Sequence, residues 1–166
     1  MTLAMAAKFK DGILCATDVA ISSGNAKRDM VDGKWFHMED SLILFAGALY
    51  YIQEVQFDDG DTLRDRLLSV REKHDGGDDE DACELLEVTP ATITFYEHYG
   101  SFYECGDYGC IGNGADLADG LLAMVYTPGR SEAWLRSHFE NIFRIVNKKC
   151  DGVSRDAKYT VVKDVF

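Results

Sequence analysis

Residues 2–18 read TLAMAAKFKDGILCATD, and we expect the rest of the fold to be organised around this stretch. Two apolar runs, residues 3–9 and 13–17, lie on either side of an Asp-Gly turn. Asp-Gly between two short apolar runs is typical of a β-hairpin. Directly before the hairpin stands Thr2, behind the initiator Met1. Removal of Met1 would leave a threonine that carries a hydroxyl nucleophile and an α-amine base on one residue.

Beyond the hairpin, blocks of expected strands alternate with pairs of expected helices. Apolar, aromatic and β-branched runs predict strands over 35–38, 42–46, 83–88, 91–98, 101–111 and 158–166. Helical spacing of apolar residues predicts helices over 49–56, 62–74, 117–125 and 131–147. Asp61 is expected to cap the second helix, and loops are expected at 22–25 and 75–81. Paired helices argue against a Rossmann-type winding and favour two antiparallel sheets between two helical layers, as one domain over 1–166.

Composition and charge exclude several classes of function. The 166 residues carry a formal net charge of −12, which argues against a nucleic-acid partner because phosphate binding needs a basic surface. No apolar stretch reaches the roughly 18 residues of a membrane span. The five cysteines are an odd number and follow no signal peptide, so reduced thiols and a cytoplasmic location are expected. Cys105 and Cys110 lack zinc-finger spacing, and neither a metal site nor a cofactor is predicted.

An amine-terminal threonine needs a cation, a carboxylate that holds the cation, and backbone N–H groups for an oxyanion. Lys34 is the candidate cation and Asp18 its carboxylate partner. Gly47 closes an apolar strand, where an N–H group could face an oxyanion and a substrate backbone could approach closely. Asp151 and Ser154 offer a carboxylate and a hydroxyl late in the chain. Each of these residues also has a purely structural interpretation, as a strand end or a turn residue.

The set as a whole resembles the proteasome β-subunit and HslV family, the threonine peptidases among the N-terminal nucleophile hydrolases. Its most specific feature is the spacing of sixteen residues from Thr2 to Asp18 and again from Asp18 to Lys34. Other segments have the family's pattern: Ser23-Gly24-Asn25, the run LFAGA at 44–48, the loop IGNG at 111–114, and Asp151-x-x-Ser154.

The resemblance implies a four-layer αββα sandwich that assembles into stacked rings around an inner chamber. It also implies that the Thr2 hydroxyl attacks a peptide carbonyl, with its own α-amine as the base. Asp18 and Lys34 would set the electrostatics and Gly47 N–H would hold the oxyanion. Asp151 and Ser154 would orient the N-terminus.

Further implications concern the substrate, the partners and one departure from the family. Ser22, Phe45 and Leu49 are expected to contribute to substrate binding, with an apolar preference. Asn113 stands where the family has serine, and an amide cannot relay a proton as a hydroxyl does. No propeptide is expected before Thr2, as in HslV, and that likeness implies a possible ATPase unfoldase partner.

The sequence therefore predicts a threonine endopeptidase that acts on peptides or unfolded proteins inside a homo-oligomeric, double ring. Two alternatives remain open. One is a small-molecule amidase with the same Thr2 mechanism, for which a closed chamber would be unnecessary. The other is a catalytically silent ring subunit or scaffold, which the replacement of serine by Asn113 favours weakly.

Overall fold

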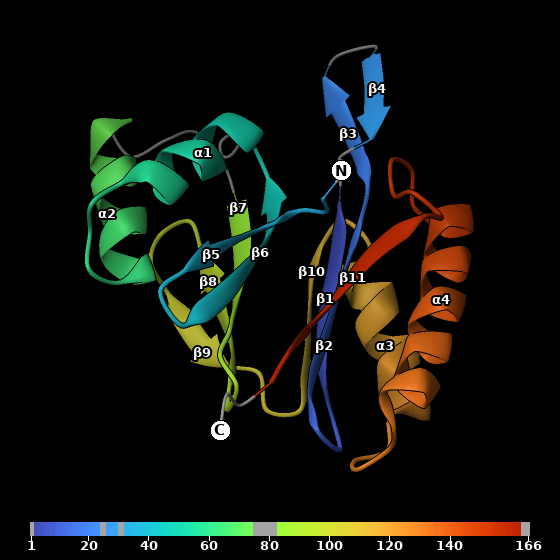
Figure 1. Ribbon diagram of the computed structural model, residues 1–166. Helices are drawn as coiled ribbons and strands as arrows, with labels where there is room; N and C mark the ends of the chain where they lie inside the picture. Colours follow the sequence, from blue (N-terminus) through green and yellow to red (C-terminus); the bar gives the residue numbers. More distant parts are fainter. Residues whose placement is uncertain (1, 24–25, 30–31, 75–82, 164–166) are drawn as a thin grey trace.

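The computed structural model describes residues 2–23, 26–29, 32–74 and 83–163, with the side chains of 21–31 left aside. Two antiparallel sheets face each other, and a pair of helices covers the outer face of each sheet (Figure 1). The predicted αββα arrangement is therefore confirmed. Its order of elements is also the predicted one, with helices arriving in pairs between blocks of strands.

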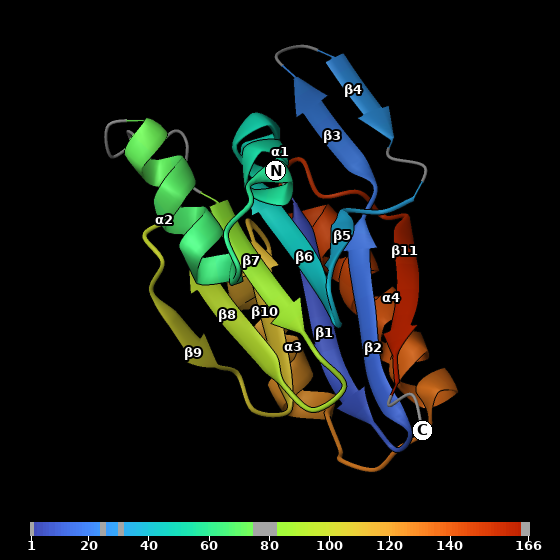
Figure 2. The same cartoon turned by 60° about the vertical axis from the view of Figure 1, so that its left-hand side comes forward.

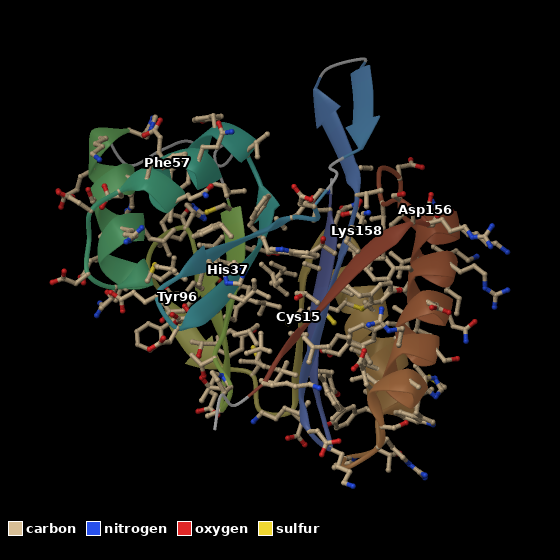
Figure 3. The ribbon with its side chains drawn as sticks, in the orientation of Figure 1. Cys15, His37, Phe57, Tyr96, Asp156 and Lys158 are labelled. Carbon is tan, nitrogen blue, oxygen red and sulfur yellow. The ribbon has the colours of Figure 1, made fainter. Side chains whose placement is uncertain are left out.

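The four-stranded sheet is built on the predicted hairpin and has the order β10-β1-β2-β11. Its strands are β1 (Leu3–Phe9), β2 (Gly12–Asp18), β10 (Tyr108–Gly112) and β11 (Ala157–Val162). Both central strands are buried on both faces. In β1, Leu3 and Met5 pack toward the helices, whereas Ala4 and Ala6 lie between the sheets. In β2, Cys15 also lies between the sheets (Figure 3).

The five-stranded sheet has the order β5-β6-β7-β8-β9. Its strands are β5 (Trp35–Met38), β6 (Ser41–Gly47), β7 (Cys83–Val88), β8 (Ile93–Glu97) and β9 (Phe102–Glu104). The apolar strand β6 is buried on both faces, as its sequence predicted. Ile43 and Phe45 face the helices, and Leu42, Leu44 and Ala46 face the other sheet.

The helices complete two further apolar layers. They are α1 (Leu49–Phe57) and α2 (Leu63–Lys73) on the five-stranded sheet, and α3 (Ala115–Val125) and α4 (Glu132–Lys149) on the four-stranded sheet. Ser131 caps α4, because its side chain accepts a hydrogen bond from the N–H of Trp134. The prediction of Asp61 as the cap of α2 is wrong. Thr62 caps that helix, with its hydroxyl accepting from Asp65 N–H at 3.1 Å.

Two further predictions from the sequence are wrong. Ser22 and Ser23 of the expected loop 22–25 belong to β3 (Ala20–Ser23), which pairs with β4 (Ala26–Asp29) and projects with it beyond both sheets (Figure 2). Gly24 and Asn25 lie outside the described residues. The expected single strand 101–111 is β9 and β10, which belong to different sheets, because the chain turns at Gly106 with a φ of 77°.

Two smaller expectations concern loops and chain ends. The closing strand β11 ends at Val162, so Lys163 does not belong to it. The last three residues of the expected strand 158–166 and the expected charged loop 75–81 lie outside the part of the chain that the structure describes.

Candidate active site

The candidate site lies where β1 begins and β2 ends. The two strands form an antiparallel hairpin, so Thr2 and Asp18 occupy the same end of the sheet. Lys34 enters from the segment before β5 and is 3% exposed. Its Nζ donates to Thr2 Oγ1 at 2.7 Å and to Asp18 Oδ1 at 2.8 Å. The structure therefore brings together the three residues that the sequence spacing singled out.

The backbone of Lys34 is held on both sides. Its N–H donates to the hydroxyl of Thr17 at 2.9 Å, and its carbonyl accepts from Phe45 N–H at 3.1 Å. Thr17 is fully buried. It was not singled out from the sequence, although a polar residue next to Asp18 at the end of an apolar strand was a signal. These bonds fix the direction from which the lysine side chain reaches Thr2.

The Asp18 carboxylate joins three parts of the chain. Oδ1 accepts from Lys34 Nζ and from the N–H of Leu3 at 3.1 Å. Oδ2 accepts from the N–H of Ser154, in the segment between α4 and β11, also at 3.1 Å. Asp18 is fully buried, and a buried carboxylate is tolerated only when it is paired and hydrogen-bonded in this way.

Burial changes the proton affinity of Lys34. Loss of hydration lowers the pKa of its ammonium below the ordinary value, while the charge of Asp18 and its hydrogen bond oppose that effect. A lysine with a lowered pKa exchanges a proton with a neighbouring hydroxyl more readily at neutral pH. The arrangement can therefore stabilise a forming alkoxide at Thr2 Oγ1 or share its proton.

The late acid–serine pair lies close to this centre but contacts it through the backbone. Ser154 reaches Asp18 with its N–H, whereas its hydroxyl accepts from Asp156 N–H at 3.1 Å. The side chain of Asn113 donates to the carbonyl of Asp151 at 3.3 Å. Both Asn113 and Asp151 are exposed. The hydroxyl of Ser154 and the amide of Asn113 thus serve the turns around the site.

The other predicted site residues lie on β6, β3 and α1. Gly47 ends β6, is exposed and has a φ of 119°, a conformation that favours glycine. Phe45 is buried on the helix side of the sheet, with its ring centroid 6.4 Å from that of Phe36. Leu49 is half-buried at the start of α1 and packs against the same apolar layer. Ser22 lies in β3, opposite Lys27.

Within the described residues, no three His, Cys, Asp or Glu side chains are grouped closely enough to hold a metal ion. None of the helices in this part of the chain combines the length and apolar character that crossing a membrane requires. All five cysteines are unpaired thiols.

No protein-family model matches the sequence, and no curated protein does. Solved structures nevertheless superpose on the chain. Anbu (ancestral β-subunit) from Yersinia bercovieri gives a TM-score of 0.78 at 14% identity, over 97% of this chain and 81% of that chain. Eukaryotic HslV from Trypanosoma brucei gives 0.72 at 12% identity, over 98% and 99%. BPH from Thiobacillus denitrificans, in complex with epoxomicin, gives 0.72 at 13% identity, over 97% and 98%.

A second Anbu, the complex from Pseudomonas aeruginosa, is a helical assembly and gives a TM-score of 0.75 at 12% identity, over 97% of this chain and 81% of that chain. Identities this low establish the fold alone. The chain therefore has the proteasome-like fold that its resemblance to proteasome β-subunits and HslV implied.

Proposed function

We propose that the protein is a threonine-type peptidase whose nucleophile is the hydroxyl of Thr2, exposed as the first residue by removal of Met1. One observation carries the proposal. The buried ammonium of Lys34 lies between Thr2 Oγ1 and the carboxylate of Asp18, with hydrogen bonds of 2.7 and 2.8 Å. A cation in this place favours the ionised form of the hydroxyl, which is the reactive form.

In the proposed reaction, the free α-amine of Thr2 takes the hydroxyl proton while Oγ1 attacks the carbonyl carbon of a peptide bond. Lys34, paired with Asp18, stabilises the negative charge that develops on Oγ1 as it loses its proton. The N–H of Gly47 donates to the oxyanion of the tetrahedral intermediate. Collapse of that intermediate passes the proton to the leaving amine and leaves an ester on Thr2, which water hydrolyses by the same steps.

The proposed setting is a homo-oligomeric, double ring in the cytoplasm that encloses the threonines and admits peptides or unfolded proteins. The chain shares its fold with HslV and with Anbu, and the Anbu complex from Pseudomonas aeruginosa is a helical assembly. The shared fold supports self-association of this chain. An ATPase that unfolds substrates is the partner that the HslV-like fold suggests. Phe45 and Leu49 are proposed to lie behind the pocket for an apolar substrate side chain, and Ser22 beside it.

A second candidate is a catalytically silent ring subunit. Two observations favour it: Asn113 stands where the resemblance expects serine, and Asp151 is exposed, with its carbonyl oxygen accepting a hydrogen bond from the Asn113 side chain. The two candidates differ in what happens at Thr2. A silent subunit needs neither the loss of Met1 nor a reactive hydroxyl.

Variants of Thr2 test the proposal directly. Thr2→Ala removes the nucleophile, and we expect hydrolysis of a fluorogenic apolar peptide to fall to background while the thermal midpoint and assembly are retained. Thr2→Ser keeps a hydroxyl and an α-amine, so measurable hydrolysis is expected to remain. Equal hydrolysis by the wild type and Thr2→Ala would exclude Thr2 as the nucleophile. Hydrolysis of small amides but not of peptides would indicate the amidase alternative.

A further inference from the structure

A carboxylate outside the proposed catalytic set connects the two sheets beside the site through a hydrogen bond. Glu84 lies on β7, with its Cα opposite Ala46, the residue before Gly47. Its Oε2 accepts a hydrogen bond of 2.6 Å from the N–H of Gly112, at the end of β10 in the other sheet. Such a short bond to a carboxylate is among the stronger hydrogen bonds in proteins. Glu84 therefore links the strand next to Gly47 with the four-stranded sheet.

The position of β10 explains why this acceptor matters. Among the described strands, β10 is at the edge of its sheet and pairs with β1, so no strand of this part of the chain lies beside the N–H groups on its outer side. Glu84 supplies an acceptor to one of them, at the last residue of the strand. An edge strand that is fixed at its end frays less than one whose end N–H is open to solvent.

Gly112 in turn lies against Thr2. Its φ is 94°, and a Cβ at this position would lie 2.1 Å from the carbonyl oxygen of Thr2. The same Cβ would lie 3.2 Å from the side chain of Ala46. Only glycine permits this close packing. The backbone of Thr2 is therefore located by Gly112, and Gly112 is held by Glu84.

We propose that Glu84 is a positioning residue for Thr2. Its carboxylate holds Gly112 against the Thr2 main chain and so sets the distance between the Thr2 hydroxyl and the N–H of Gly47, which lie on different sheets. Glu84 acts through Gly112 and touches no substrate. The inference rests on the proposed function of Thr2, but the packing of Thr2 against Gly112 can be measured without any reaction.

The test compares Glu84→Ala, Glu84→Gln and the control Glu87→Ala in the Met1-free protein. Glu87 lies on the same strand and accepts a hydrogen bond of 3.0 Å from the hydroxyl of Tyr96, so its removal also deletes one carboxylate contact of β7. Two quantities are measured for each variant. One is the rate at which a peptide epoxyketone modifies Thr2, as a function of its concentration. The other is amide hydrogen exchange at residues 3–5 and 108–113.

For Glu84→Ala we expect the maximal rate of modification to fall about ten- to a hundredfold, since small displacements of reacting groups have effects of this size. The half-saturating concentration is expected to stay unchanged, because substrate contacts remain. Exchange is expected to accelerate at both segments. Glu84→Gln keeps a carbonyl acceptor and is expected to restore most of the rate and protection. Glu87→Ala is expected to change neither quantity.

Unchanged exchange at residues 3–5 in Glu84→Ala would overturn the inference, as would equal losses in Glu87→Ala or no rescue in Glu84→Gln. A wild-type protein that is not modified at all would sink the proposed function instead. In that event the exchange data alone still decide whether Glu84 positions Thr2. A normal maximal rate with a raised half-saturating concentration would assign Glu84 to substrate binding and contradict the positioning role.

Discussion

At the scale of single residues, Lys34 is expected to affect both the stability of the fold and the proposed catalysis. The Lys34 side chain is 4% exposed, and its partner Asp18 is fully buried. Removing one member of such a pair leaves an uncompensated charge in the interior, which costs about 3–5 kcal/mol of folding free energy. A loss of activity in a Lys34 variant must therefore be separated from a loss of structure.

We expect Lys34→Ala to lower peptide hydrolysis by about 10²–10⁴-fold, the range typical of lost acid–base or electrostatic assistance. Lys34→Arg keeps the charge, but its guanidinium cannot release a proton and is too broad for the site, so no rescue is expected. The combined change Lys34→Met with Asp18→Asn removes both charges and should recover stability without activity. Hydrolysis rates and thermal midpoints are measured together.

The matched control is Lys158→Ala, because Lys158 is an exposed lysine on β11, the strand beside β2 (Figure 3). It should retain wild-type rate and midpoint. Near-normal hydrolysis by Lys34→Ala would exclude the proposed role of the lysine.

The sequence predicted that Thr2, Asp18 and Lys34 lie together, but it did not predict the hydrogen bonds that fix their positions. The spacing of Thr2, Asp18 and Lys34 was recognised through the resemblance to the proteasome β-subunit and HslV family, and the β1–β2 hairpin accounts for the proximity of Thr2 and Asp18 alone. The hydrogen bonds from Lys34 N–H to the Thr17 hydroxyl and from Ser154 N–H to the Asp18 carboxylate depend on how separate segments pack. The contact of Glu84 with Gly112 likewise depends on the separation of two sheets, on which the sequence pattern carries no information.

At the scale of elements, Asp58 connects the two helices that cover the five-stranded sheet. It follows α1, and its carboxylate accepts from Gly60 N–H at 3.0 Å and from Ser69 and Lys73 of α2 at 2.8 Å each. The hydrogen bond from Lys73, then that from Ser69, lowers the pKa of Asp58 to about 2. The ionised carboxylate therefore stabilises the folded state.

The sign of the pH dependence follows from that pKa. Because the folded value lies below the ordinary value of about 3.9, this stabilisation is fully present above about pH 4 and is lost as the pH falls toward 2. We expect Asp58→Asn to lower the free energy of unfolding at pH 7 by about 1–2 kcal/mol, at the modest end because Lys73 is exposed to solvent. The variant should also lose less stability than the wild type between pH 4 and 2.

Urea unfolding at several pH values measures both effects. Asp59→Asn is the control, since Asp59 is the exposed neighbour. If Asp58→Asn and Asp59→Asn gave the same stability and the same acid dependence, the connection between α1 and α2 would not depend on Asp58.

The elements themselves were predictable where one pattern dominates. The hairpin of β1 and β2 and the buried strand β6 agree with their apolar runs, and α4 agrees with its apolar stripe. The division of 101–111 was not predictable, because Phe102–Glu104 and Tyr108–Gly112 carry similar strand patterns and only the turn at Gly106 separates them. Membership of different sheets is a tertiary property that local propensity does not determine.

At the scale of the whole molecule, the proposed activity on proteins depends on assembly. Thr2 lies at the end of the central strand β1. A closed ring would restrict access to it to extended chains, whereas an isolated subunit imposes no such restriction. We expect a native mass that is a multiple of the 18.5 kDa chain and consistent with two stacked rings. Native mass spectrometry with electron microscopy measures it. A monomer across the micromolar range would contradict the ring and favour the amidase alternative.

The measurement that tests the central claim most directly is the intact mass of the purified protein before and after treatment with a peptide epoxyketone. This reagent forms a ring with both the hydroxyl and the α-amine of an amine-terminal threonine, so it reports both requirements at once. The account predicts a chain that lacks Met1 and gains one adduct, located at Thr2 and missing in Thr2→Ala. A Met1-free chain without an adduct, or an adduct that persists in Thr2→Ala, would contradict it.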